Sequence, residues 1–212
     1  PTRHGILDFL VTDLRTGGRV PVTSRHRKVK AVWNLLSDSG VGVGVIGWWA
    51  TWPAEFVDGY VVSDRVAYQL FGQAVSTSGP APGKTFPPEL YAKIQPLLVP
   101  PARIDAQKLK KYLKYPLPEQ PAAQASREEE MKTVLASTAT YENIAMALGS
   151  KGFNSFEAIY FEGIDTVSHL FMPFRPPMRD GIDTKEFTAY SNAVDAFYET
   201  QDEILGEILS KA

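Results

Sequence analysis

The sequence of 212 residues contains no cysteine and only three histidines. The absence of cysteine excludes disulfide bonds, a thiol nucleophile and a thiolate metal site. Any metal ion must therefore be bound by carboxylates and imidazoles. The chain also lacks any run approaching the roughly 18 apolar residues that a membrane-spanning helix requires, so no membrane span is predicted in it.

The net charge is small as well. The formal value is -2 at pH 7 and the isoelectric point is near 6.0, so nothing attracts nucleic acid generally, and no nucleic acid polymer is expected as a partner. Hydrophobic residues make up 44% of the chain, which is enough for a compact domain with a real core.

The first third of the chain has an α/β pattern. Apolar residues at helical spacing predict a helix over 28–39, and Gly40 supplies its stop. Valine-rich runs predict strands at 41–48 and 59–63. We expect an α/β fold whose central, mostly parallel sheet has helices on both faces.

The middle of the chain is different in composition. Residues 74–88 and 114–126 are rich in Pro, Gly, Ser and Ala, and they bracket two short helical stretches at 88–95 and 105–113. This pattern predicts an irregular, Pro-rich insertion over about 66–125. Such an insertion serves either as a lid or substrate wall, or as a passive surface excursion.

Two capping signals organise the last third. Ser126 and Glu129 form a capping box that opens a long helix ending near Leu148, and Asp183 and Glu186 cap another. The last helix is predicted to pack through an apolar stripe. The stripe comprises Phe187, Tyr190, Val194, Phe197, Leu205 and Ile208.

The most informative segment lies between these two helices. Residues 155–161 predict a buried strand, Gly163 relieves the turn after it, and Asp165 begins a helix that brings His169 onto the same face. A carboxylate and an imidazole that converge suit zinc or manganese. The alternative is an ordinary N-cap aspartate with a solvated histidine nearby.

Trp48, Trp49 and Trp52 follow the strand predicted at 41–48, at the edge where open sheets carry their ligands. They either wall a substrate pocket or fill the interface between sheet and helix. Two interpretations of Asp64 and Arg65 also remain. Either the guanidinium of Arg65 binds a phosphate through two parallel N–H groups, or the two side chains form an ion pair at the surface.

Two short motifs are rejected. Gly42, Gly44 and Gly47 match the G-x-G-x-x-G spacing, but they lie within a strand instead of opening a helix, so close backbone packing explains them better than a dinucleotide. The Gly83-Lys84-Thr85 sequence lacks the first P-loop glycine and runs into two prolines, and we interpret it as a loop.

Three segments resemble the type I phosphodiesterase/nucleotide pyrophosphatase family of the alkaline phosphatase superfamily. PTRHGI at residues 1–6 is similar to the stretch that follows the family's nucleophile helix. VGVGVIGWWATWPAE at 41–55, with GYVVSDR at 59–65, is the second segment. GIDTVSH at 163–169 is similar to the family's D-x-x-x-H metal motif.

The resemblance implies that residues 1–212 are part of one alkaline-phosphatase-like hydrolase domain with two divalent metal ions, commonly zinc, acting on a small-molecule phosphoester. Asp165 and His169 are the metal ligands that it assigns. His4 receives no ligand role, and a structural hydrogen bond is expected for it. The family's nucleophile and remaining ligands have no counterpart here, so the chain is expected to be an internal fragment, inactive alone.

Two alternatives stay open. The same metal frame also serves other reactions of the superfamily: phosphomonoester hydrolysis, sulfate ester hydrolysis and phosphoryl-group transfer. The second alternative is a noncatalytic module that keeps the fold and binds a ligand at its tryptophan-rich edge.

Overall fold

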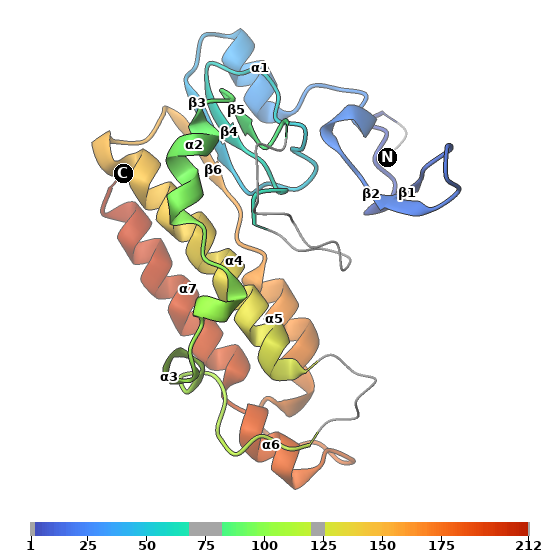
Figure 1. The fold of residues 1–212 in the computed structure, drawn as a ribbon, viewed down its shortest axis with the longest axis vertical. Coiled ribbons are helices and arrows are strands. Elements are labelled where there is room, and N and C mark those ends of the chain that lie inside the picture. Colours follow the sequence, from blue (N-terminus) through green and yellow to red (C-terminus); the bar gives the residue numbers. More distant parts are fainter. Residues whose placement is uncertain (1–2, 68–81, 120–125, 212) are drawn as a thin grey trace. The chain divides into compact units, whose positions relative to one another are not determined.

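The computed structural model describes residues 3–67, 82–119 and 126–211 (Figure 1). The chain divides into two compact units, which we describe separately. The sheet unit comprises Pro1–Pro96 and Lys151–Tyr160, and the helical unit comprises Leu97–Ser150 and Phe161–Ala212. Parts of the two Pro-rich segments predicted above, 74–81 and 120–125, lie outside the described residues.

The sheet unit is built on a four-stranded sheet. Its strands are β3 (Val43–Ile46), β4 (Gly59–Val62), β5 (Thr85–Phe86) and β6 (Phe156–Ile159), in the order β5-β4-β3-β6. β3 pairs in parallel with β4 and β6, whereas β5 runs antiparallel to β4. The predicted α/β class with a mostly parallel sheet is therefore confirmed.

One face of this sheet is covered by α1 (Val32–Asp38). Trp33 of α1 packs against Val43 and Val45 of β3 and against Val61 of β4. These valines share a face because alternate side chains of a strand point to the same side. The buried tryptophan thus joins helix to sheet.

Shorter elements complete the sheet unit. They are the antiparallel hairpin of β1 (Leu10–Thr12) and β2 (Arg19–Pro21), the 3-10 turn η1 (Ser24–His26) and α2 (Leu90–Ile94). Two more 3-10 turns, η3 (Gln95–Leu97) and η5 (Gly149–Lys151), lie where the chain passes between the units.

The Gly83-Lys84-Thr85 sequence was interpreted as a loop, which is right for the turn at Gly83 and Lys84 but wrong for Thr85. Thr85 and Phe86 form the edge strand β5, and the backbone oxygen of Lys84 accepts a hydrogen bond from Ser63 N at 2.9 Å. The Lys84 side chain is buried, with Nζ 3.3 Å from Tyr91 Oη. A two-residue strand between turn residues has no periodicity to detect.

The other face of the sheet holds a polar pair. Tyr60 on β4 and Glu157 on β6 flank Gly44 on the central strand β3. Tyr60 Oη donates a hydrogen bond of 2.6 Å to Glu157 Oε1 across this glycine. A Cβ atom at Gly44 would overlap the carboxylate, so close packing explains this glycine, although a side chain and not the predicted backbone lies against it.

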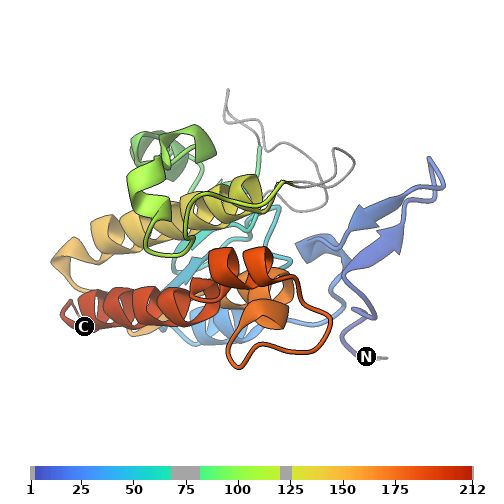
Figure 2. The same ribbon diagram turned by 90° about the horizontal axis from the view of Figure 1, so that it is seen from below.

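The helical unit is dominated by α4 (Arg127–Leu148), α5 (Gly163–Phe171) and α7 (Ala193–Leu209), which pack against one another. Figures 1 and 2 show α4, in yellow, lying alongside α7, in red. The remaining elements are η4 (Pro101–Arg103), α3 (Ala106–Leu109), η6 (Met172–Phe174) and α6 (Thr184–Tyr190). No helix among the described residues is long and apolar enough to cross a membrane.

The capping predictions are confirmed at one helix only. Asp183 caps α6, because its Oδ1 accepts hydrogen bonds from the backbone of Lys185 and Glu186. Ser126 occupies the N-cap position of α4, but its side chain makes no capping hydrogen bond. The predicted capping box at 126–129 is therefore wrong in its interaction, although the helix begins where expected.

The predicted last helix is in fact two. α6 ends at Tyr190, and α7 begins at Ala193 after Ser191 and Asn192, residues that compete with the helix for backbone hydrogen bonds. In the C-terminal half of α7, Ile204 is buried and Leu205 is exposed. The predicted stripe was wrong there, because 197, 201, 204 and 208 follow one helical face and 205 lies beside it.

Replacing Gly44 by alanine should destabilise the protein by about 1–3 kcal/mol, because the added methyl group overlaps the Glu157 carboxylate. The matched control is Gly206→Ala in α7, where no atom lies within 4 Å of the added carbon. The control should stabilise the protein by about 0.5–1 kcal/mol through helix propensity. Urea unfolding of both variants measures the difference, and equal effects would contradict this packing role.

Replacing Glu157 by glutamine should weaken the pH dependence of stability. Burial raises the pKa of Glu157, so the folded state holds this proton more tightly than the unfolded chain. Its contribution is complete below the ordinary glutamate pKa and is lost as pH rises through the folded-state value. As pH rises from the ordinary glutamate pKa through the raised folded-state pKa, the wild type should lose more unfolding free energy than Glu157→Gln. A parallel loss in both proteins would refute it.

Candidate functional site

The predicted metal ligands lie on α5, which follows β6 after three residues. Asp165 is in the first turn, and Glu162, not Asp165, occupies the N-cap position. His169 Nε2 lies 3.6 Å from Asp165 Oδ1, and the side chains are 80% and 69% exposed, respectively. The structure therefore brings these two side chains together at the surface of the helical unit.

Gly163 has a different role from the predicted one. It is the first residue of α5, and its φ angle lies outside the left-handed region, so it relieves no turn. A Cβ atom there would overlap the Phe197 ring of α7 and lie 3.0 Å from Thr138 Oγ1 of α4. Gly163 is thus required where three helices meet, and this packing fixes the start of the helix that carries the pair.

The donor atoms of the pair fit a shared metal ion. Zinc binds imidazole nitrogen and carboxylate oxygen at about 2.0–2.2 Å, so two ligands at the tetrahedral angle lie about 3.4 Å apart. The observed 3.6 Å is close to this value and too long for a good hydrogen bond. Within the described part of the chain, no group of three or more His, Cys, Asp or Glu residues forms a metal site. Among the described residues, Asp165 and His169 are therefore a pair of candidate donors and not a complete site.

Glu162 adds a carboxyl group at the beginning of the same helix. Burial, followed by the negative charge of Asp165, raises its pKa to about 7. It is therefore only partly ionised near neutral pH. Sequence reasoning missed this residue because the shift comes from tertiary burial.

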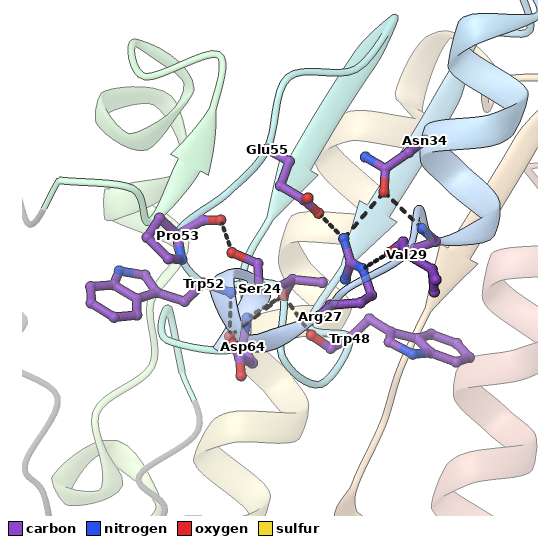
Figure 3. A network of polar contacts seen from close by, with 11 residues as sticks. Ser24, Arg27, Val29, Asn34, Trp48, Trp52, Pro53, Glu55 and Asp64 are labelled. Atoms are coloured by element: carbon purple, nitrogen blue, oxygen red, sulfur yellow. Dashed lines mark hydrogen bonds and ion pairs between the residues drawn. The ribbon is translucent and has the colours of Figure 1, made fainter. Parts of the chain in front are cut away.

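A second candidate region follows the carboxyl ends of β3 and β4 in the sheet unit. Asp64 is buried there, and its two carboxylate oxygens accept hydrogen bonds from Ala50 N at 3.1 Å and Trp52 N at 3.0 Å (Figure 3). In return, Asp64 N donates to Thr51 Oγ1 at 3.0 Å. Burial raises the pKa of Asp64 against the opposing effects of Arg65 and these hydrogen bonds. Asp64 therefore holds the loop at residues 50–52 in place, a role that we call the clamp, and because it is buried it does not form a surface ion pair.

Arg27 connects α1 with Glu55, which follows the same loop. Its guanidinium donates to Val29 O, Asn34 Oδ1 and Glu55 Oε2, and it lies 5.4 Å from the centre of the Trp33 ring (Figure 3). The sequence around Arg27 gives no sign of this network. Its partner Glu55 is 28 residues away, so only the fold brings them together.

The three tryptophans after β3 have separate environments. Trp48 contacts Trp33 and Tyr160, with ring centres 6.2 and 5.6 Å apart. Trp49 contacts Phe9 edge to face at 5.4 Å, and Trp52 carries the guanidinium of Arg65 at 4.9 Å. Figure 3 shows Trp48 and Trp52 extending to opposite sides of their loop. None of the three is buried; Trp33 fills the interface between helix and sheet.

Trp49 lines a hollow in the surface of the sheet unit, as the pocket alternative predicts for it. The hollow has a volume of about 340 Å³, which is within the size range of small-molecule sites, and a mostly apolar lining that includes Asp8. Its lining residues are Ile6, Leu7, Asp8, Phe9, Val22, Trp49 and Ala50. The structure therefore pairs an apolar hollow with the loop that Asp64 holds.

The other two histidines have local roles. His4 Nδ1 accepts a hydrogen bond from Ile6 N at 3.2 Å, which confirms the structural role expected for it. His26 Nδ1 accepts one from Thr23 N at 3.0 Å. His169 alone lies beside a carboxylate in the described residues.

Comparison with protein-family models, with curated proteins and with solved structures finds no match for this chain.

Replacing Asp64 by alanine should destabilise the protein by about 2–4 kcal/mol, because two backbone N–H groups lose their acceptors. Asp58→Ala, at an exposed position just before β4, is the control and should change stability by no more than about 0.5 kcal/mol. Urea unfolding followed by tryptophan fluorescence measures both. An Asp64→Ala protein as stable as the control would contradict the clamp.

Proposed function

We propose that this chain belongs to a metal-dependent phosphoester hydrolase of the phosphodiesterase/nucleotide pyrophosphatase type, with an alkaline-phosphatase-like sheet covered by helices on both faces. Asp165 and His169 bind one of two divalent ions, with zinc the best-suited metal. The observation that carries the proposal is the exposed pair of donors, 3.6 Å apart on one face of α5. The GIDTVSH resemblance gives this pair its place in the enzyme.

The chemistry of the donor set supports this proposal. One carboxylate oxygen and one imidazole nitrogen suit zinc, and their high exposure leaves room for ligands from other segments. When bound, such ions lower the pKa of a hydroxyl nucleophile and neutralise charge on phosphoryl oxygens. Asp165 and His169 hold and orient their ion, while the nucleophile and other ligands come from outside these 212 residues.

Other reactions of the superfamily are the alternatives within enzymes. Phosphomonoester hydrolysis, sulfate ester hydrolysis and phosphoryl-group transfer use the same metal frame, so Asp165 and His169 do not distinguish them. A panel of chromogenic monoesters, diesters and sulfate esters, assayed on the full-length protein, separates these classes by the preferred substrate.

A noncatalytic ligand-binding module is the alternative from another class. The apolar hollow beside Trp49 is the observation that favours it. Binding of an apolar ligand there, without turnover of any ester by the full-length protein, would support a binding module and refute the hydrolase.

Replacing Asp165 by asparagine or His169 by glutamine in the full-length protein should lower bound metal and diester turnover together. The loss should be at least about 10- to 100-fold, because even residues that only hydrogen-bond to a metal ligand have effects of this size when they are replaced. Mass spectrometry of the metal content and a diester assay measure the two quantities. Each lost ligand weakens binding of the same ion, so both variants should respond alike.

The control for these variants is Asp202→Asn, an exposed carboxylate on α7 that should leave both quantities unchanged. If the Asp165 and His169 variants keep the metal content and turnover of the wild type, the two side chains are an ordinary solvent-exposed pair. In that case the metal assignment fails.

A further inference from the structure

Arg65 has an unusual setting at the carboxyl end of β4. Its guanidinium carbon lies 4.9 Å from the centre of the Trp52 ring. The indole beneath it is fixed at two points: Trp52 N donates to Asp64 Oδ1 at 3.0 Å, and Trp52 Nε1 donates to Pro82 O at 3.2 Å. The arginine therefore rests on a platform that the fold holds in place.

The N–H groups of Arg65 are unused by the described part of the protein. Among residues 3–67, 82–119 and 126–211, Arg65 forms neither an ion pair nor a hydrogen bond. Arg27, in the same unit, differs: its guanidinium has three acceptors. The neighbouring Asp64 carboxylate already accepts from the amides of Ala50 and Trp52. Arg27 is structural, whereas Arg65 keeps its donors available.

Stacking prepares these donors for an anion. A guanidinium that lies on an aromatic ring uses its face, and the N–H groups point outward from its edge. Two parallel N–H groups match two oxygens of a phosphate, and stacking reduces the freedom that binding must remove. The carboxyl ends of parallel strands are also where open α/β sheets bind ligands.

We propose that Arg65, held on Trp52, binds the phosphate group of a phosphate ester. The site lies in the sheet unit and uses none of the metal-ligand residues. The proposal concerns binding alone, so it stands or falls independently of hydrolysis and of the metal ions. Of the two roles that the sequence left open for Arg65, the proposal assigns phosphate binding and not a surface ion pair with Asp64.

The test uses the 212-residue chain in excess EDTA, so that no metal ion contributes to binding. Phenyl phosphate is titrated and binding is measured by calorimetry, with tryptophan fluorescence as a second signal. Arg65→Gln should weaken binding about 10- to 100-fold, the value of a charge-assisted hydrogen-bonded pair. The affinity of Arg65→Lys should lie between those of the wild type and Arg65→Gln, because lysine keeps the charge but lacks the two parallel N–H groups.

Two controls make the result specific. Arg15→Gln removes an arginine from the exposed β1–β2 turn and should leave the dissociation constant unchanged. Asp202→Asn, which removes an exposed carboxylate from α7, should also leave it unchanged, and the excess EDTA separates this site from the proposed metal centre. Circular dichroism verifies that each variant is folded, and Arg65→Lys serves as the conservative variant if Arg65→Gln is unstable.

Three outcomes would overturn the proposal. The first is an Arg65→Gln chain that binds phenyl phosphate as tightly as the wild type. The second is acetate binding as tightly as phenyl phosphate, which would remove the phosphate class. The third is equal loss in Arg65→Gln and Arg15→Gln, which would show a general effect of positive charge.

Discussion

The carboxylate of Asp64 sets the course of the chain after the central strand. Its two oxygens accept the amide hydrogens of Ala50 and Trp52, and its own amide donates to Thr51. Ala50 adopts a positive φ of 55°, which a residue with a side chain rarely does without such support. Trp49 and Ala50 line the apolar hollow, and Trp52 supports Arg65. One buried group therefore positions both the hollow and the indole beneath Arg65.

Close packing of side chains against the backbone of two glycines is the second constraint. Gly44 leaves space for the hydrogen bond between Tyr60 and Glu157 across the middle of the sheet. Gly163 leaves space for Phe197 against the first turn of α5. In both places a methyl group would displace a packed neighbour. The two glycines thus have the same physical function, although one lies in a strand and the other begins a helix.

The candidate metal pair depends less on tertiary structure than these features do. Asp165 and His169 are four residues apart on a helix, and this spacing alone places their side chains on one face. Tertiary packing contributes the position at which α5 begins, through Gly163. It also contributes the burial that raises the pKa of Glu162. The exposure of the pair fits a site completed by other segments, which is the arrangement that the proposed function requires.

The residue pattern alone predicted the α/β class, strands within 41–48, 59–63 and 155–161, the long helix to Leu148 and the face shared by Asp165 and His169. These features follow from periodicity and spacing along the chain, which local residues specify. Only the tertiary structure decided the edge strand at Thr85, the division of the last helix, the clamp by Asp64 and the partners of Arg27. The clamp joins residues 12 and 14 positions apart, and the Arg27–Glu55 pair joins residues 28 positions apart. No local pattern encodes such pairs, because their energies arise only after burial has brought the groups together.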